Sequence, residues 1–273
     1  MEKQIQEIYN NYLTRAKEVY GELPKHCYET KIVIGSNPDD HHASGASCIE
    51  NKIYLNPEST NVEWVIFHEM EHIRLARNLG KDHTTGFYDL YEYKTDNGIK
   101  HGNGEAINEA LTDISVEYLL GKEDTSSVAY YETIQLVKQL FSLLGVNKED
   151  IIKYCQPSGK DKFIADLKEL TGYDLFISID IQLSNVHDLH ILDLNKEYNE
   201  FGAIKRKPLG TYCSNETLEA RLKFQQLLET IISFMVKKLS ISRQEIINRL
   251  KKMNELSPYK NGELEMIIEN LSV

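Results

Sequence analysis

The 273-residue chain has no run of about 18 consecutive apolar residues, so the sequence predicts no membrane-spanning helix. Its first 20 residues alternate charged and apolar side chains and lack the apolar core of a secretory signal. Basic residues are also few, since 31 Lys and Arg face 42 Asp and Glu and leave a formal charge of −11. Because no signal or spanning segment is predicted, we expect a cytoplasmic protein. A protein of that charge repels polyanions, so we expect it to bind no nucleic acid.

Cysteine is sparse as well. Four cysteines stand far apart and none forms a CxxC pair, which argues against a zinc ribbon and against a disulfide framework. No internal repeat of about 20–50 residues stands out, so a solenoid is not expected. We therefore expect one compact domain over residues 1–273 with reduced, mostly buried thiols at Cys27, Cys48, Cys155 and Cys213.

Hydrophobic periodicity predicts a mainly helical α+β fold. Apolar residues at helical spacing favour a helix over 2–20, and short apolar runs at 30–34 and 52–55 predict strands of a small sheet. Residues 81–103 are rich in turn residues and carry a hairpin signal at Asn97-Gly98. Further helices are expected at 126–144, 148–154, 160–170, 214–239, 242–255 and 262–271, whereas 173–212 fits either a helix or short strands.

Two helices in the middle of the chain carry the clearest end signals. Thr60-Asn-Val-Glu63 is a capping box for a helix over 61–79, which Gly80 ends. A second helix is expected from about Glu105 to Leu120. The expected organisation is a helix and small sheet over 1–58, this pair of helices over 59–121, and a helical part over 122–273.

The first of these helices contains His68-Glu69-Met70-Glu71-His72, an HExxH pentapeptide. Residues i and i+4 project from one helix face about 5–6 Å apart, so both imidazoles can reach one metal ion. Glu69 lies one residue further round the helix, where it can take a proton from water at the metal. Polar groups in so apolar a helix are costly unless they pair or bind a metal. The alternatives are a solvated helix face and an internal hydrogen-bonded network.

A catalytic zinc site needs a third protein ligand and an open position for water. In the second helix, Glu109 and Asp113 are four residues apart and face the same way. One carboxylate can bind the ion while the other accepts a hydrogen bond from the far nitrogen of a ligating histidine. Glu105, one turn earlier, is the rival ligand, and an ordinary surface charge is the alternative role for Asp113.

The two motifs together resemble the gluzincin metallopeptidases of the thermolysin type, in which an HExxH helix precedes a helix with NExxSD. The resemblance covers residues 60–120, and Thr112 stands where the family has serine. It implies a zincin-like core that binds Zn2+ and the following residue roles: His68, His72 and Glu109 as zinc ligands, Glu69 as general base, and Asp113 as partner of a ligand histidine.

Residues 106–113 are also similar to small bacterial relatives of that clan, in which a tyrosine often opens the next helix, as Tyr130 does here. The chain is too short for both large domains of thermolysin, and its sequence does not identify the downstream histidine of that family. Tyr130 is therefore the first candidate for the group that stabilises the transition state. The others are Tyr131, His83, His101, His187 and the tyrosines of the 87–93 segment.

The sequence thus predicts a zinc-dependent hydrolase, and most closely a peptidase acting on a peptide or protein substrate. The strand at 52–55 is expected to be a sheet edge that holds an extended peptide. One alternative is a non-catalytic zinc-binding regulatory or interaction module. Another is a helical interaction protein that binds its partner through residues 214–271. No pattern in the chain specifies a substrate side chain or an oligomeric state.

Overall fold

The computed structural model contains ten helices and five strands in the part of the chain that it describes. This confirms a mainly helical α+β fold with a small sheet near the N-terminus. The described residues are 2–35, 45–47, 50–57, 59, 61–77, 84–95, 98–122, 131–201, 214–238 and 242–256.

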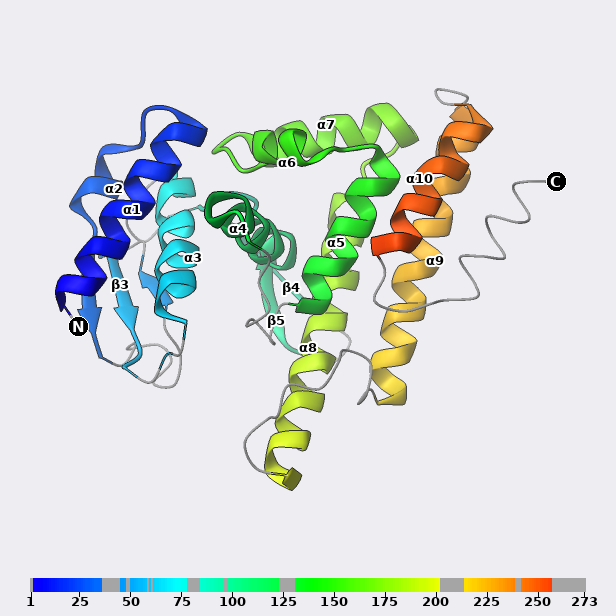
Figure 1. Ribbon diagram of the computed structural model, residues 1–273. Helices are drawn as coiled ribbons and strands as arrows, with labels where there is room; N and C mark the ends of the chain where they lie inside the picture. The colour runs from blue at the N-terminus through cyan, green and yellow to red at the C-terminus, as the bar shows by residue number, and fades with distance from the viewer. Residues whose placement is uncertain are drawn as a thin grey trace.

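The N-terminal part is a small sheet covered by helices (Figure 1). Its elements are α1 (Glu2–Tyr20), α2 (Lys25–Glu29), β1 (Lys31–Ile34), β2 (Gly45–Ser47), β3 (Lys52–Leu55) and α3 (Val62–Leu75). Strand β3 lies between β1, to which it is parallel, and β2, to which it is antiparallel. The expectation that residues 52–55 form an edge was therefore wrong, because β2 pairs with them from a Gly/Ser-rich segment that the sequence suggested was loop.

Helix α3 differs at both ends from the expected helix over 61–79. Its N-cap is Asn61, whose side chain accepts a hydrogen bond from the backbone N–H of Trp64 at 3.4 Å, whereas Thr60 lies outside the described residues. The helix ends at Leu75 because Ala76 turns into extended backbone and pairs with Thr85. Residues 78–83, including Gly80, are outside the described part.

A hairpin follows, formed by antiparallel strands β4 (Asp89–Lys94) and β5 (Lys100–Asn103), and it leads into α4 (Glu105–Leu120). Gly98 lies in its turn with a positive φ of 76°, at the expected hairpin signal. Helix α4 starts after Gly104, which has no side chain to cap it. Instead the carboxylate of Asp180 accepts hydrogen bonds from the backbone N–H groups of Gly104 and Ile107, at 2.8 and 3.1 Å. The helix ends at Gly121, as expected.

The rest of the described chain is helical. Its elements are α5 (Tyr131–Leu144), α6 (Lys148–Tyr154), α7 (Gly159–Thr171), α8 (Phe176–Phe201), α9 (Asn215–Lys238) and α10 (Arg243–Leu256). The ambiguous segment is thus helical from 176 to 201, while the expected helix over 262–271 lies outside the described residues. Within the described ranges, no helix is long and apolar enough to cross a membrane.

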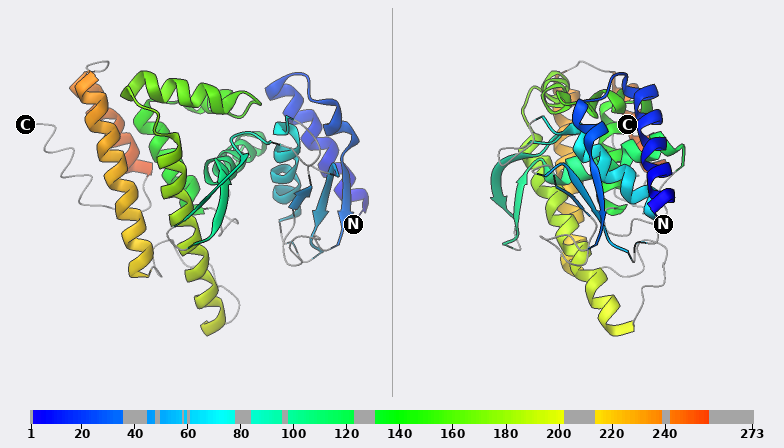
Figure 2. Two further views of the ribbon diagram at one scale, coloured as in Figure 1. Left: turned by 180° about the vertical axis from the view of Figure 1, so that it is seen from behind. Right: turned by 90° about the vertical axis from the view of Figure 1, so that its left-hand side faces the viewer.

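Two hydrophobic clusters form the core, and α4 contributes to both. The first three turns of α4 pack against α5 and α8 in the larger cluster, and Val116 and Leu119 near its end join α1, α3 and the sheet in the smaller one. Figure 1 and the reversed view in Figure 2 show α4 between these two parts of the molecule. Cys27 and Cys155 are buried free thiols, whereas Cys48 and Cys213 lie outside the described residues.

Candidate metal centre

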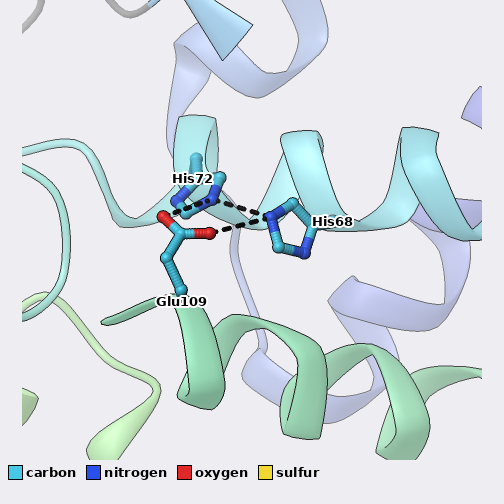
Figure 3. Close-up of side chains that lie close together, drawn as sticks. All are labelled: His68, His72 and Glu109. Atoms are coloured by element: carbon cyan, nitrogen blue, oxygen red, sulfur yellow. Dashed lines mark hydrogen bonds and ion pairs between the residues drawn. The ribbon is translucent and has the colours of Figure 1, made fainter. Parts of the chain in front are cut away.

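Helices α3 and α4 pack against each other and bring together the side chains that the sequence singled out. His68 and His72 project from successive turns of α3, and Glu109 projects toward them from α4 (Figure 3). Each histidine side chain is 12 % exposed and that of Glu109 is 19 % exposed. The three groups form a cluster that solvent can reach.

The spacing of the three ligand groups fits a zinc ion. Nε2 of His68 is 3.0 Å from Nε2 of His72 and 3.2 Å from Oε2 of Glu109, and Nε2 of His72 is 3.3 Å from Oε1 of Glu109. Tetrahedral zinc binds nitrogen at about 2.0–2.1 Å, which places two ligand atoms about 3.3 Å apart. Two imidazoles and a carboxylate are also a usual donor set for catalytic zinc.

Hydrogen atoms alone satisfy at most two of the three contacts in this cluster. If both Nε2 atoms carry a proton, each donates to Glu109, but the two nitrogens then face each other as donors. If only His72 carries one, its N–H is shared between His68 and Glu109, but the lone pair of His68 then faces a carboxylate oxygen. A cation between the three groups is attracted by every lone pair at once. Protons thus leave one of the three contacts unsatisfied, whereas a cation would be attracted by all three groups.

The structure brings Glu109, and not the rival Glu105, to the two histidines. Oε2 of Glu105 accepts a hydrogen bond from the backbone N–H of Gly102 at 2.7 Å and lies 3.5 Å from Nδ1 of His101. Glu105 thus holds the hairpin against the start of α4. Within the described residues, the cluster of metal-ligating groups consists of His68, His72 and Glu109.

Asp113 lies one turn after Glu109 and is 1 % exposed. Its Oδ1 is 2.7 Å from Nδ1 of His68. A hydrogen bond at that distance to a buried carboxylate holds the proton on Nδ1 and directs the lone pair of Nε2 toward the cluster. This is the orientation that zinc binding through Nε2 of His68 requires.

Charges in the cluster shift the pKa of each member in the direction that favours its ionised form. Burial lowers the pKa of His68, but the carboxylates of Asp113 and Glu109 together outweigh this and raise it well above its ordinary value. Burial likewise lowers the pKa of His72, and Glu109 reverses the shift. Burial raises the pKa of Glu109, but His72 and His68 hold it far below its ordinary value. A carboxylate that stays ionised is a ready ligand for a cation, whereas each histidine must release its Nε2 proton before it can bind one.

Asn108 contacts the second histidine, a role that sequence reasoning missed. Its Oδ1 accepts a hydrogen bond from the backbone N–H of Phe87 at 3.0 Å, and its Nδ2 lies 3.3 Å from Nδ1 of His72. In this amide orientation neutral His72 keeps its proton on Nε2. Binding a metal through Nε2 requires that proton on Nδ1, and the Asn108 amide cannot turn its Oδ1 toward Nδ1 without giving up the hydrogen bond from Phe87. The signal was present in the sequence, because Asn108 directly precedes Glu109 on α4.

Glu69, the expected general base, lies between the two histidines on α3 and is 8 % exposed. Its negative charge contributes to raising the pKa of His72. On a helix of 3.6 residues per turn, position 69 is about 60° round from position 72, so Glu69 borders the cluster.

The candidates for the transition-state donor are spread over several elements. His101 is 2.9 Å from Oδ1 of Asp188, which anchors it to α8. His187 is also on α8, and the Glu109 carboxylate is among the charges that act on it. Tyr88 of the 87–93 segment is part-buried, and its ring lies against Gly102 of β5. Tyr130 and His83, and the side chains of Tyr91, Tyr93 and Tyr131, lie outside the described residues.

Comparisons of this chain with known protein families, with curated proteins and with solved structures found no match. The gluzincin resemblance therefore stays a prediction that rests on residues 60–120.

Proposed function

We propose that this chain is a zinc-dependent hydrolase whose metal ion is held by His68, His72 and Glu109. The observation that carries the proposal is the three-way contact between these groups, with atom separations of 3.0, 3.2 and 3.3 Å. Protons satisfy two of those contacts and a cation satisfies all three. The buried Asp113, which fixes the ring of His68, provides the outer partner that zinc sites typically have.

Three features of the cluster suit hydrolysis. Zinc, when bound, supplies a Lewis acid that acidifies water and polarises a carbonyl group. Glu69 borders the cluster and serves as the base that takes the proton of the attacking water and passes it to the leaving amine. The side chains of the cluster are 12–19 % exposed, so water can reach them from solvent.

We propose a peptide or protein as the substrate. The resemblance of residues 60–120 to gluzincin peptidases supports this class. Among the described residues, β2 is an edge strand of the sheet, so its outer backbone groups can pair with a further strand. It also packs against α3. An extended peptide that adds to β2 by main-chain hydrogen bonds lies next to the helix that carries His68 and His72.

The first experiment is elemental analysis of the purified protein after dialysis against zinc. About one zinc per chain is expected for the native protein and a large loss is expected for His72→Ala. Glu105→Gln is the matched control, because Glu105 lies on the same helix as Glu109 but its carboxylate is not part of the cluster. Absence of zinc from the native protein, even after zinc is supplied, would refute the metal site and favour a helical interaction protein.

The second experiment separates an enzyme from a non-catalytic zinc module. The native protein is incubated with a pool of unstructured peptides, and new termini are identified by mass spectrometry. Glu69→Gln is expected to keep zinc and to lose cleavage by a factor of at least about 100, in line with the loss of a general base. Zinc binding without cleavage by the native protein would favour a regulatory or interaction module.

A further inference from the structure

Trp64, the single tryptophan of the chain, is hydrogen-bonded to the Asp113 carboxylate, which in turn contacts His68 of the cluster. It lies one turn before His68 on α3 and is 5 % exposed. Its indole N–H donates to Oδ1 of Asp113 at 3.0 Å. The same oxygen is 2.7 Å from Nδ1 of His68. One oxygen atom of Asp113 therefore joins the indole to a proposed zinc ligand.

Because the other oxygen of Asp113 has no described partner, these two donors alone hold the carboxylate in place. Oδ2 is buried and, within the described part of the chain, has no hydrogen-bond partner. Both donors come from α3, whereas the carboxylate comes from α4. With His68 alone, the carboxylate would be free to rotate about its Cβ–Cγ bond while keeping one hydrogen bond. A second donor on the same oxygen restricts that rotation.

We propose that Trp64 is a positioning residue of the metal centre. Its indole holds Asp113 in the orientation in which Oδ1 accepts the Nδ1 proton of His68, so that Nε2 of His68 presents its lone pair to the cluster. This inference rests on the proposed zinc site, and it adds a residue that belongs to neither sequence motif.

Two effects of the indole on zinc affinity oppose each other. Its N–H withdraws electron density from Oδ1, which makes His68 a slightly weaker ligand. It also fixes the carboxylate, which keeps the imidazole in the ligating orientation. The positional effect outweighs the electronic one, because this buried carboxylate receives its other described hydrogen bond from His68 alone. Removing the indole N–H is thus expected to weaken zinc binding.

The test compares Trp64→Phe with Phe67→Leu by zinc titration against a chromophoric chelator. Phe67 is the matched control because it is buried in the same core cluster on α3 and its side chain has no group that hydrogen-bonds to Asp113. Zinc affinity is expected to fall about three- to tenfold in Trp64→Phe, less than the 10- to 100-fold typical of a direct partner of a ligand. Phe67→Leu is expected to keep the native affinity. A zinc affinity of Trp64→Phe that equals or exceeds that of Phe67→Leu would overturn the positioning role.

A double variant tests whether Trp64 acts through Asp113. In the Asp113→Asn background, Trp64→Phe is expected to cause no further loss of zinc affinity, because the carboxylate that the indole positions is already gone. An additional threefold to tenfold loss in that background would show that the indole acts by another route and would overturn the proposal.

A metal-free measurement keeps the inference separate from the proposed function. The single indole gives one indole N–H signal in a 1H–15N NMR spectrum, and Asp113→Asn is expected to move it and to speed its exchange with solvent. In Trp64→Phe the ring Nδ1–H of His68 is expected to exchange faster with solvent. If the native protein binds no zinc, the proposed function fails, whereas these signals still decide the positioning role. Unchanged signals in both variants would refute it.

Discussion

The strongest prediction about stability concerns a buried ion pair on α3. Glu71 is 0 % exposed and Arg74 is 2 % exposed. Nε and Nη2 of Arg74 donate to Glu71 at 2.9 and 2.7 Å, and Nη2 also donates to the backbone carbonyl of Cys155 at 2.8 Å. We predict that Arg74→Met lowers the free energy of unfolding substantially at neutral pH, because it leaves a buried carboxylate without its counter-charge.

The size of this loss follows from the groups that remain. Removing one partner of a buried ion pair typically costs about 3–5 kcal/mol. Glu71 keeps three hydroxyl donors in the variant: Tyr12 at 2.8 Å, Ser115 at 2.6 Å and Tyr20 at 3.3 Å. These hydrogen bonds still solvate the carboxylate, so we expect the lower end of the range, about 3 kcal/mol. That is a large share of the roughly 5–15 kcal/mol that stabilises a typical domain.

The loss should also depend on pH. Burial raises the pKa of Glu71, but Arg74 and the hydroxyl donors together hold it below its ordinary value in the native protein. Without Arg74 the effect of burial is opposed only by those hydroxyls, so we expect the folded-state pKa to rise above the unfolded-state value. A group of that kind destabilises the fold increasingly as pH rises through the unfolded-state pKa of about 4.3. The difference in stability between native protein and variant should therefore shrink below pH 5.

Urea unfolding, followed by the fluorescence of Trp64 and by circular dichroism, measures the effect. Lys122→Met is the matched control, because it breaks an ion pair between Lys122 and Glu63 of α3 at which the side chains are 52 % and 36 % exposed. It should cost less than about 1 kcal/mol. The Glu71→Gln, Arg74→Met double variant should be more stable than Arg74→Met alone, and it remains measurable if the single variant does not fold. A loss below about 1 kcal/mol for Arg74→Met, or strict additivity in the double variant, would refute this reasoning.

Two further predictions concern Asn108 and His101. Asn108→Asp places a carboxylate oxygen against Nδ1 of His72 and keeps an acceptor for the backbone N–H of Phe87, so zinc is expected to bind about tenfold more tightly in chelator competition. Weaker binding by the aspartate variant would contradict the tautomer argument. Hydrogen bonds with Asp188 and Glu105, against the effect of burial, raise the pKa of His101 to about 10. Because the folded-state pKa exceeds the unfolded-state value of about 6.5, this stabilisation is complete below pH 6.5 and is lost as pH rises toward 10. The urea midpoint of His101→Gln should therefore fall less as pH rises than that of the native protein. An identical fall would argue against a raised pKa of His101.

Each of the two residue pairs of the candidate site could be predicted from the sequence, because each depends on spacing within one helix. His68 and His72 share a face of α3, and Glu109 and Asp113 share a face of α4, whatever surrounds them. The choice between Glu105 and Glu109 did not follow, because it depends on how the two helices pack. In the structure Glu105 accepts a hydrogen bond from the backbone of Gly102 in the hairpin, and Glu109 faces the histidines.

Features that depend on distant parts of the chain could not be predicted. The pairing of Ala76 with Thr85 ends α3 early, although the apolar pattern continues to Leu79. Strand β2 has no strand-like pattern of its own and forms because β3 offers it backbone partners. The N-cap of α4 is supplied by Asp180, 76 residues after Gly104 along the chain. Hydrogen bonds of this kind appear in a sequence only as isolated polar residues.

The position of the His68, His72 and Glu109 cluster depends on contacts that join α3 and α4 outside it. Ser115 of α4 donates to the buried Glu71 carboxylate of α3 at 2.6 Å, and Tyr12 of α1 donates to the same group. Meanwhile Asp180 holds the start of α4 in the larger core cluster. The two helices are thus fixed by contacts that do not involve the ligand atoms. These contacts hold the three side chains 3.0–3.3 Å apart, and a cation bound between them would link the two core clusters that α4 joins.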